Sequence, residues 1–379
     1  MNNNVTVLKD LDENILINKQ SKCIALLIDW NQYKKKISIF LLNTMLKNKI
    51  KIPIIVPADY NSANDLIKYF DSHMFEIARS IKDESSWSNI RFRLRGLGDM
   101  IQRTYLNKVI LDTIRENLKE GECLKIFTNE CWIPWEFVFD SSDGQFWGEK
   151  YILVRDIIEG AINPSAKKPD KYKKNLTKII HAIGNDTKCS SKLINMFNGI
   201  CNEKLIDYNN PAHFQYYSVS DIKESIESNV DIIHFSCHAR IDEHGNRYLQ
   251  LGPKNIDHNL YYFMLETLDF RGKILFINSC SSLLPQQEGF GPLKDLTTFG
   301  WLVSQSGYGA LIGSLSPILS TSAIEFSKLF YSKFLCEGLS IGQSLYESKK
   351  QLKTNNSPLG LLYGFFGNPS LDKQIRRRK

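Results

Sequence analysis

Residues Val230–Cys237 read VDIIHFSC, and residues Lys273–Ser279 read KILFINS. Each run is short and mostly apolar, and each is followed by a reactive side chain, His238 in the first case and Cys280 in the second. Apolar runs of this length, bounded by turn residues, are typical of strands buried inside a parallel sheet. Reacting groups in such sheets gather just beyond the carboxyl ends of the strands.

The spacing of these two residues allows their strands to be neighbours. His238 and Cys280 lie 42 positions apart (280 − 238). One parallel crossover connection needs ~30 residues or more, which this interval accommodates. An imidazole beside a thiol can take its proton, and the thiolate is the strong nucleophile. The pattern therefore predicts a cysteine hydrolase.

Length and composition bound the class of protein. A chain of 379 residues is too long for one ordinary core, so two domains are expected. No run approaches ~18 consecutive apolar residues, which argues against membrane insertion. The start of the chain does not resemble a secretory signal, and the eight cysteines form no disulfide framework, so a cytoplasmic location is expected. The net charge of +7 comes without a basic stripe interleaved with aromatic residues, so nucleic acid is not expected as a direct ligand.

Strand and helix patterns alternate along the chain, which predicts a doubly wound, mostly parallel α/β sheet flanked by helices. Further strands are predicted at Cys23–Asp29, Ile52–Val56, Leu124–Phe127, Lys178–Gly184 and Ala310–Leu315. Helices are predicted at Leu66–Ile81, Met100–Leu118, Lys188–Asn202, Ser220–Ser228 (capped by Ser220 and Asp221), Leu260–Leu268, Leu293–Ser306, Ala323–Leu335 and Ile341–Leu352. The domain prediction is an N-terminal half at 1–160, a linker at 161–175 rich in proline and charge, a C-terminal half at 176–372 and a basic tail at 373–379.

Seven motifs follow one another along the chain, in an order that is informative where each alone is weak. They are CWIPWEFVFD (Cys131–Asp140), YILVRDI (Tyr151–Ile157), IIHFSCHA (Ile232–Ala239), LFINSCSS (Leu275–Ser282), GYGALIGSLSP (Gly307–Pro317), FSKLFYSKFL (Phe326–Leu335) and LLYGFFGNP (Leu361–Pro369). Together they resemble the CHAT domain, the bacterial branch of the caspase–separase–gingipain clan of cysteine peptidases. The resemblance extends over roughly residues 85–370.

The resemblance implies a role for each matching residue. His238 falls on the position of the general base and Cys280 on that of the nucleophile, while the backbone N–H groups of Cys280 and Ala239 fall on the oxyanion donors. This chain departs from the family pattern at two positions. Ala239 stands where relatives usually have glycine, and Ser316 stands where they usually have a tryptophan that borders the substrate groove. A more open or more polar groove is therefore expected.

By the same analogy, the pocket for the residue before the cleaved bond is lined by Asp186, Asn278 and Ser316. Asp186 would favour arginine or lysine in that pocket. The segment Ser281–Gly291 directly follows the nucleophile and is interpreted as a groove wall that moves on activation. The resemblance also implies an N-terminal pseudo-protease half. Its only histidine is His73, so it offers no second His–Cys pair.

The hypothesis is a cytoplasmic cysteine endopeptidase that cleaves a protein substrate through the His238–Cys280 dyad and a thioester. The resemblance further implies a latent bacterial stress or defence effector, activated by a protein partner or signal, and the sequence calls for no cofactor.

Three alternatives stay open at this point. The first is an inactive caspase-fold scaffold that only binds other proteins. The second is a flavodoxin-like binder of a small molecule, although no phosphate-binding glycine loop is present. The third is a zinc site formed by His234, Cys237, His238 and Cys280, which strand alternation disfavours because Cys237 points away from the histidines. His234 and Cys237 are more simply interpreted as core residues, and Trp135 with Glu136 as packing between the halves.

Overall fold

The computed structural model describes the chain in segments. These are residues 23–31, 36–43, 54–56, 84–128, 133–157, 178–184, 207–208, 218–227, 230–244, 247–252, 256–261, 273–280 and 309–370, with several single positions between them. The strands are β1 Cys23–Asn31, β2 Lys36–Asn43, β3 Ile54–Val56, β4 Cys123–Thr128, β5 Phe139–Asp140, β6 Gln145–Phe146, β7 Ile152–Ile157, β8 Lys178–Ile183, β9 Asp207–Tyr208, β10 Ile232–Ser236, β11 His238–Ile241, β12 Arg247–Gln250, β13 Asn259–Tyr261, β14 Ile274–Asn278, β15 Ala310–Ser314 and β16 Tyr363–Gly367. The α-helices are α3 Trp87–Tyr105, α4 Lys108–Asn117, α5 Trp147–Lys150, α8 Val219–Glu227, α11 Ser320–Tyr331 and α12 Ile341–Thr354, and the short helical turns are η1 Glu84–Ser86, η2 Trp135–Phe137, η3 Ile256–His258, η4 Ser332–Cys336 and η5 Leu359–Leu362.

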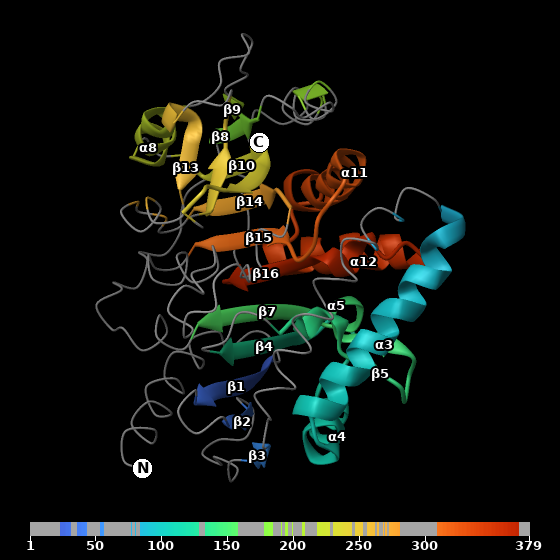
Figure 1. The fold of residues 1–379 in the computed structure, drawn as a ribbon. Helices are drawn as coiled ribbons and strands as arrows, with labels where there is room; N and C mark the ends of the chain where they lie inside the picture. The colour runs from blue at the N-terminus through green and yellow to red at the C-terminus, as the bar shows by residue number, and fades with distance from the viewer. Residues whose placement is uncertain are drawn as a thin grey trace, which may run out of the picture.

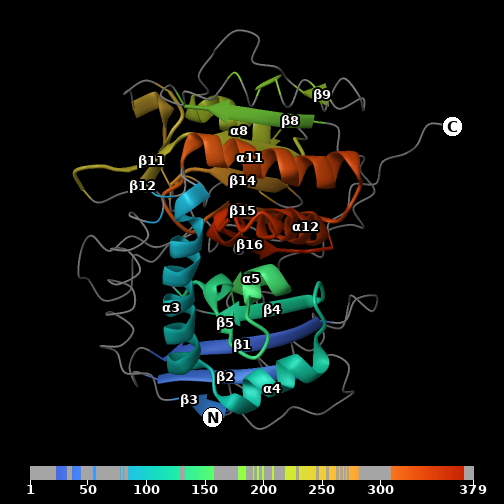
Figure 2. The ribbon, with the colours of Figure 1, turned by 90° about the vertical axis from the view of Figure 1, so that its right-hand side faces the viewer.

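One sheet runs through both halves of the chain. Within the described residues it has 11 strands in the order β3-β2-β1-β4-β7-β16-β15-β14-β10-β8-β9, which Figures 1 and 2 show as a single stack. Strand β7 of the first half pairs with β16 of the second, with Arg155 opposite Phe366. The predicted linker and tail lie outside the described residues, so the domain boundaries stay a prediction.

Two groups of parallel strands in this sheet run in opposite directions. Strand β16 is parallel to β7 but antiparallel to β15. Strands β1, β4 and β7 are parallel to one another, as are β15, β14, β10, β8 and β9. The carboxyl ends of the two groups therefore lie at opposite edges of the sheet, so β1, β4 and β7 do not end where β10 and β14 end.

The second half is doubly wound, as predicted. Chain order moves outward from β8 to β9, then crosses back to β10 and continues through β14, β15 and β16. This reversal places a topological switch point between β8 and β10, where α/β sheets bind ligands beyond the strand ends.

The two faces of these strands bury separate cores, because successive side chains of a strand point to opposite sides. Ile274 and Phe276 of β14 pack with side chains of α11 and α12. Leu275 and Ile277 pack on the other face, with side chains of α8 and of the small antiparallel sheet β11-β12-β13. Burial on both faces explains why these strands are apolar throughout.

Several element predictions are corrected by the structure. The helix predicted at Met100–Leu118 is two helices, α3 and α4, because Asn107 begins a new one. The start of the helix predicted at Leu260–Leu268 is instead strand β13, with Leu260 paired to Leu249. Helix α8 is capped by reciprocal bonds between Ser218 and Asp221, and not by Ser220. Strand β2 was not predicted, although KISIFLLN has strand-like apolar content.

Helix α3 runs beside much of the sheet. In Figure 2 it extends from the level of β2 to the level of β15. Its N-terminal turns contact the second half directly: Arg91 donates to the Ser357 carbonyl at 3.4 Å, and Asn356 donates to the Ser88 hydroxyl at 3.1 Å. Arg91 also forms a two-bond ion pair with Glu149 of α5, at 2.6 and 2.7 Å.

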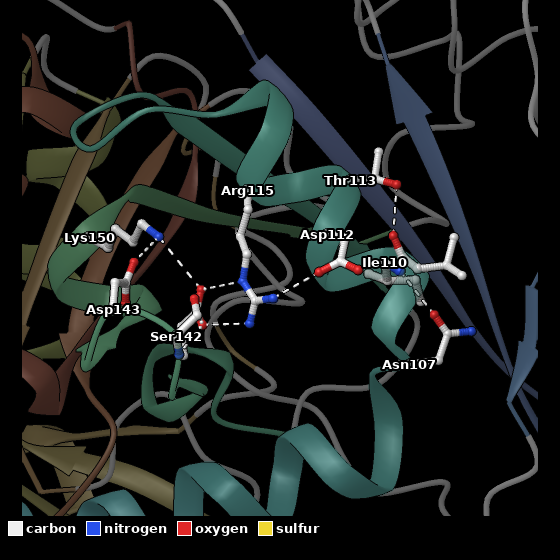
Figure 3. Close-up of polar contacts among 10 residues, drawn as sticks. Asn107, Ile110, Asp112, Thr113, Arg115, Ser142, Asp143 and Lys150 are labelled. Atoms are coloured by element: carbon white, nitrogen blue, oxygen red, sulfur yellow. Dashed lines mark hydrogen bonds and ion pairs between the residues drawn. The ribbon is translucent and has the colours of Figure 1, made fainter.

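A polar cluster attaches α4 to the turn after β5 (Figure 3). Asn107 accepts from the Ile110 N–H at 2.9 Å and caps the helix. Arg115 donates to both carboxylate oxygens of Asp140, at 2.6 and 3.0 Å. Burial alone would raise the pKa of Asp140, but hydrogen bonds from Arg115 and Ser142 outweigh it and lower this pKa to about 2. The cluster is therefore a fixed structural contact.

Charged side chains are buried where the two halves meet. Arg155 of β7 pairs with Glu136 of η2, and both are essentially inaccessible to solvent. Lys349 of α12 is buried beside them and donates to the Tyr363 carbonyl at 2.7 Å. Trp135 is also fully buried, and its ring meets that of Tyr105 of α3 edge-on at a centroid distance of 6.1 Å. Buried ion pairs are costly to disrupt, so this joint resists separation.

Candidate active site

The two reactive residues follow two strands that are neighbours in the sheet. Strands β10 and β14 are neighbours and parallel, and their last registered pair is Ser236 opposite Asn278. The register continues beyond the strands, because the Cys237 N–H donates to the Asn278 carbonyl at 3.4 Å. His238 and Cys280 each lie two residues past that pair. The strands that precede the two residues are therefore neighbours, as the spacing allowed, and His238 continues from β10 into β11 of the smaller antiparallel sheet.

Cys280 is half-buried, while Cys237 is buried. The Cys280 Sγ lies 3.8 Å from the Ile318 carbonyl oxygen, in the segment that leads from β15 into α11. Burial raises the pKa of the Cys237 thiol, and the nearby Cys280 raises it further. The two cysteines thus differ in environment: Cys237 is a protonated core residue, as predicted, whereas Cys280 is partly exposed.

His238 opens a hairpin that folds over the switch point. It is half-buried at the first position of β11, opposite Gln250 of β12, and Ala239 follows it opposite Leu249. The hairpin approaches the end of β8 closely. A Cβ added at Gly184 would lie 2.7 Å from the Gln250 carbonyl oxygen and 3.0 Å from the Cys237 Cβ. A glycine at this position therefore allows the histidine hairpin to settle against the sheet.

Two of the predicted pocket residues are buried in the protein. Asn278 is 6 % exposed, and its amide bonds to side chains of β10, α11 and β16. Ser316 is fully buried, and its backbone N–H bonds to the Ser314 hydroxyl at 3.1 Å. The third, Asp186, lies outside the described residues, as does the predicted groove wall Ser281–Gly291. Asn278 thus lies two residues before Cys280 in the chain, but its amide points into the core.

The sequence pattern missed one buried part of this region. His181 of β8 bonds to the Ser236 hydroxyl at 2.9 Å, and its ring meets that of His234 edge-on at a centroid distance of 4.9 Å. Burial lowers the pKa of His181 to about 3, so this ring is neutral. The two histidines lie opposite each other because β8 pairs with β10 in this register. The sequence alone does not show that register, so the pair could not be predicted from it.

Metal binding receives no support from the described residues, where no group of three or more His, Cys, Asp or Glu side chains is arranged to hold an ion. None of the helices described here has the length and apolar character needed to cross a membrane.

The sheet order and the strand-end residues define a caspase-like α/β fold. The whole arrangement superposes on crystal structures of the Saccharomyces cerevisiae separase–securin complex, with TM-scores of 0.59 and 0.58 at 11% sequence identity, over 97% of this chain. The match covers 31% of the separase chain, so this chain spans about a third of that protein's length. The structure of the Porphyromonas gingivalis RgpB pro- and mature-domain complex gives a TM-score of 0.44 at 12% identity, over 84% of this chain and 79% of that one.

Residues 201–362 match the family model of the CHAT domain. This segment contains both His238 and Cys280. A search of curated protein sequences finds no match. The fold and the family match are those expected from the seven motifs.

Proposed function

We propose that this chain is a cysteine endopeptidase in which His238 and Cys280 form the catalytic dyad. The observation that carries the proposal is the register of β10 and β14, which places both residues two positions past one registered pair. The CHAT match and the separase-like fold support the peptidase class, since both concern the region in which the dyad lies. No further charged group is required, because an imidazole alone can activate a thiol.

The chemistry follows from the two side chains. His238 accepts the proton of Cys280, and the sulfur attacks the carbonyl carbon of a peptide bond to form a tetrahedral oxyanion. Backbone N–H groups of Ala239 and Cys280 stabilise that oxyanion, which typically contributes ~3 kcal/mol per donor in hydrolases. The imidazolium then protonates the leaving amine as the C–N bond breaks, leaving a thioester. Water, deprotonated by His238, hydrolyses the thioester and restores the thiol.

Latency with a protein partner is the second part of the proposal. The separase structures were obtained as complexes with securin, and by analogy this chain would be controlled by a protein partner or activating signal. Its biological setting would be a cytoplasmic stress or defence response. If Asp186 reaches the specificity pocket, peptides with arginine or lysine before the cleaved bond are preferred, and an Asp186→Asn variant loses that preference over leucine.

Alkylation by iodoacetamide tests the dyad without knowledge of the substrate. The rate at each cysteine is measured by mass spectrometry of peptides from the full chain. Cys280 should react at neutral pH at least ~10-fold faster than Cys336, a half-buried cysteine far along the chain, because the proposed dyad pairs the Cys280 thiol with the imidazole of His238. His238→Ala should remove this advantage and leave Cys336 unchanged. Equal rates at the two cysteines, unaffected by His238→Ala, would support the inactive scaffold instead.

A further inference from the structure

The last residue of the nucleophile strand lies at the centre of a buried polar network. The Asn278 Nδ2 atom donates to the Ser327 hydroxyl at 2.7 Å and lies 3.2 Å from the His234 Nε2. The Asn278 Oδ1 atom accepts from the Tyr363 hydroxyl at 2.8 Å. All four side chains are buried. One amide therefore joins β14 to the histidine strand β10, to helix α11 and to strand β16.

The hydrogen-bond directions in this network are determined by its members. The Ser327 hydroxyl donates to the Ala323 carbonyl at 2.7 Å, so it accepts from Asn278. With Tyr363 donating to Oδ1, the amide nitrogen faces His234, and the His234 Nε2 is the acceptor. The proton of the imidazole then sits on Nδ1, which donates to the Tyr331 hydroxyl at 2.9 Å. Burial lowers the pKa of His234 well below its ordinary value, and the nearby His181 lowers it further, so the ring is neutral as this pattern requires.

This network contacts both strands that carry the proposed dyad. Asn278 lies two residues before Cys280, and His234 lies four residues before His238. The ring of His234 stacks on Phe276 of the nucleophile strand at a centroid distance of 4.9 Å, which adds a second contact between the same strands. Tyr363 lies close enough to Cys280 that the cysteine charge, after burial, contributes to raising the pKa of Tyr363. The network thus lies in the electrostatic neighbourhood of Cys280.

We infer that Asn278 is a positioning residue for the His238–Cys280 dyad: its amide holds the ends of β10 and β14 in register through His234, Ser327 and Tyr363. The inference rests on the proposed function and assigns Asn278 a role that differs from the predicted contact with substrate. Both amide N–H groups are engaged inside the protein, so the amide has no donor to offer a substrate. Misplacement of reacting groups by ~1 Å can cost ~10²-fold in rate, so loss of one of the three contacts is expected to be measurable.

Paired serine variants test the inference with a matched control. Ser327 and Ser348 are both buried helix serines that donate to the carbonyl four residues earlier at 2.7 Å, but only Ser327 also accepts from Asn278. The pH profile of iodoacetamide alkylation at Cys280 is measured from pH 5 to 10 on the full chain. Ser327→Ala should slow alkylation at pH 7 by about 10-fold and move the profile toward higher pH. Ser348→Ala should match the wild type, and thermal unfolding should show that both variants fold.

A tyrosine pair provides the second arm. Tyr363→Phe removes the donor to Asn278, whereas Tyr346→Phe removes a hydroxyl that donates to Glu120 on the surface. Only Tyr363→Phe should shift the profile of Cys280. The positioning role would be overturned if Ser327→Ala and Tyr363→Phe fold and keep the wild-type alkylation profile while His238→Ala abolishes fast alkylation. That result would leave the dyad intact. If His238→Ala itself changes nothing, the proposed function fails and the positioning role fails with it.

Discussion

The buried lysine at the joint between the halves makes stability depend on pH in a distinctive way. Burial lowers the pKa of Lys349 to about 8 from an ordinary 10.5, against the opposing influence of Glu136 and Glu149, and Arg155 lowers it slightly more. Between these two values the unfolded chain binds a proton that the folded chain has released. Stability must then rise with pH across this window, because the unfolded state binds more protons there.

The size of the effect follows from the two pKa values. At about 1.4 kcal/mol per pH unit, the interval from 10.5 to about 8 corresponds to about 3 kcal/mol of unfavourable charge burial at neutral pH. Most of this cost, about 2 to 3 kcal/mol, should disappear between pH 7 and pH 10. The measurement should stop at pH 10, because burial raises the pKa of Tyr363, and tyrosine ionisation in the unfolded chain opposes the trend above that pH.

Urea unfolding at a series of pH values checks this prediction. The quantity of interest is the difference in free energy of unfolding between the wild type and Lys349→Met, since other groups cancel in that difference. Lys350→Met is the matched control, because Lys350 lies on the same helix but is solvated, 3.9 Å from Glu120. The wild type should gain stability relative to Lys349→Met as the pH rises, and Lys350→Met should follow the wild type. Parallel curves for Lys349→Met and wild type would refute the burial of this amine against β7 and η2.

Three further predictions concern the same scaffold. Gly98→Ala should lower the free energy of unfolding by about 1–3 kcal/mol or more, because the new Cβ would lie 1.9 Å from the last carbonyl oxygen of η2. An unchanged melting temperature would show that α3 does not pack against η2 at this position. Arg155→Met should lower the free energy of unfolding in urea by about 3–5 kcal/mol, because it leaves the Glu136 carboxylate buried without its partner. Adding Glu136→Gln to this variant should recover much of the lost stability. If the destabilisation of the double variant equals the sum of the two single effects, the pairing is contradicted. Asp140→Asn should lower the free energy of unfolding by about 1 kcal/mol at neutral pH, a modest value because Arg115 is partly solvated. The difference in stability between the wild type and this variant should shrink as the pH falls from about 4 to 2, where Asp140 takes up its proton. A difference that persists at pH 2 would exclude the Asp140 carboxylate as its cause.

The sequence predicted the strands that position the site because their evidence is local. Strands β8, β10, β14 and β15 each appear as a short apolar run that ends at polar or turn residues, and the predicted bounds agree with the structure within a residue or two. The errors arose where distant pairing decides the structure. The three-residue strand β13 exists because β12 lies beside it, and no pattern within its own residues opposes a helix.

The candidate site divides in the same way. His238 and Cys280 could be named from sequence because each directly follows a recognisable strand. The role of Asn278 could not, since it depends on which side chains β10, α11 and β16 bring to the amide, and these come from positions 44 to 85 residues away. Position in the chain suggested a pocket residue, whereas burial and bonding indicate one that holds two strands together.

The dyad itself is tested most directly by mapping new protein N-termini in cells that express this chain. The wild type is compared with Cys280→Ala and His238→Ala under inducing stress, and Cys336→Ala serves as the control for loss of a thiol. The account predicts a set of cleaved sites present with the wild type and Cys336→Ala but absent with either dyad variant. Identical N-terminal profiles for the wild type and Cys280→Ala under every inducing condition would contradict the assignment of Cys280 as a nucleophile.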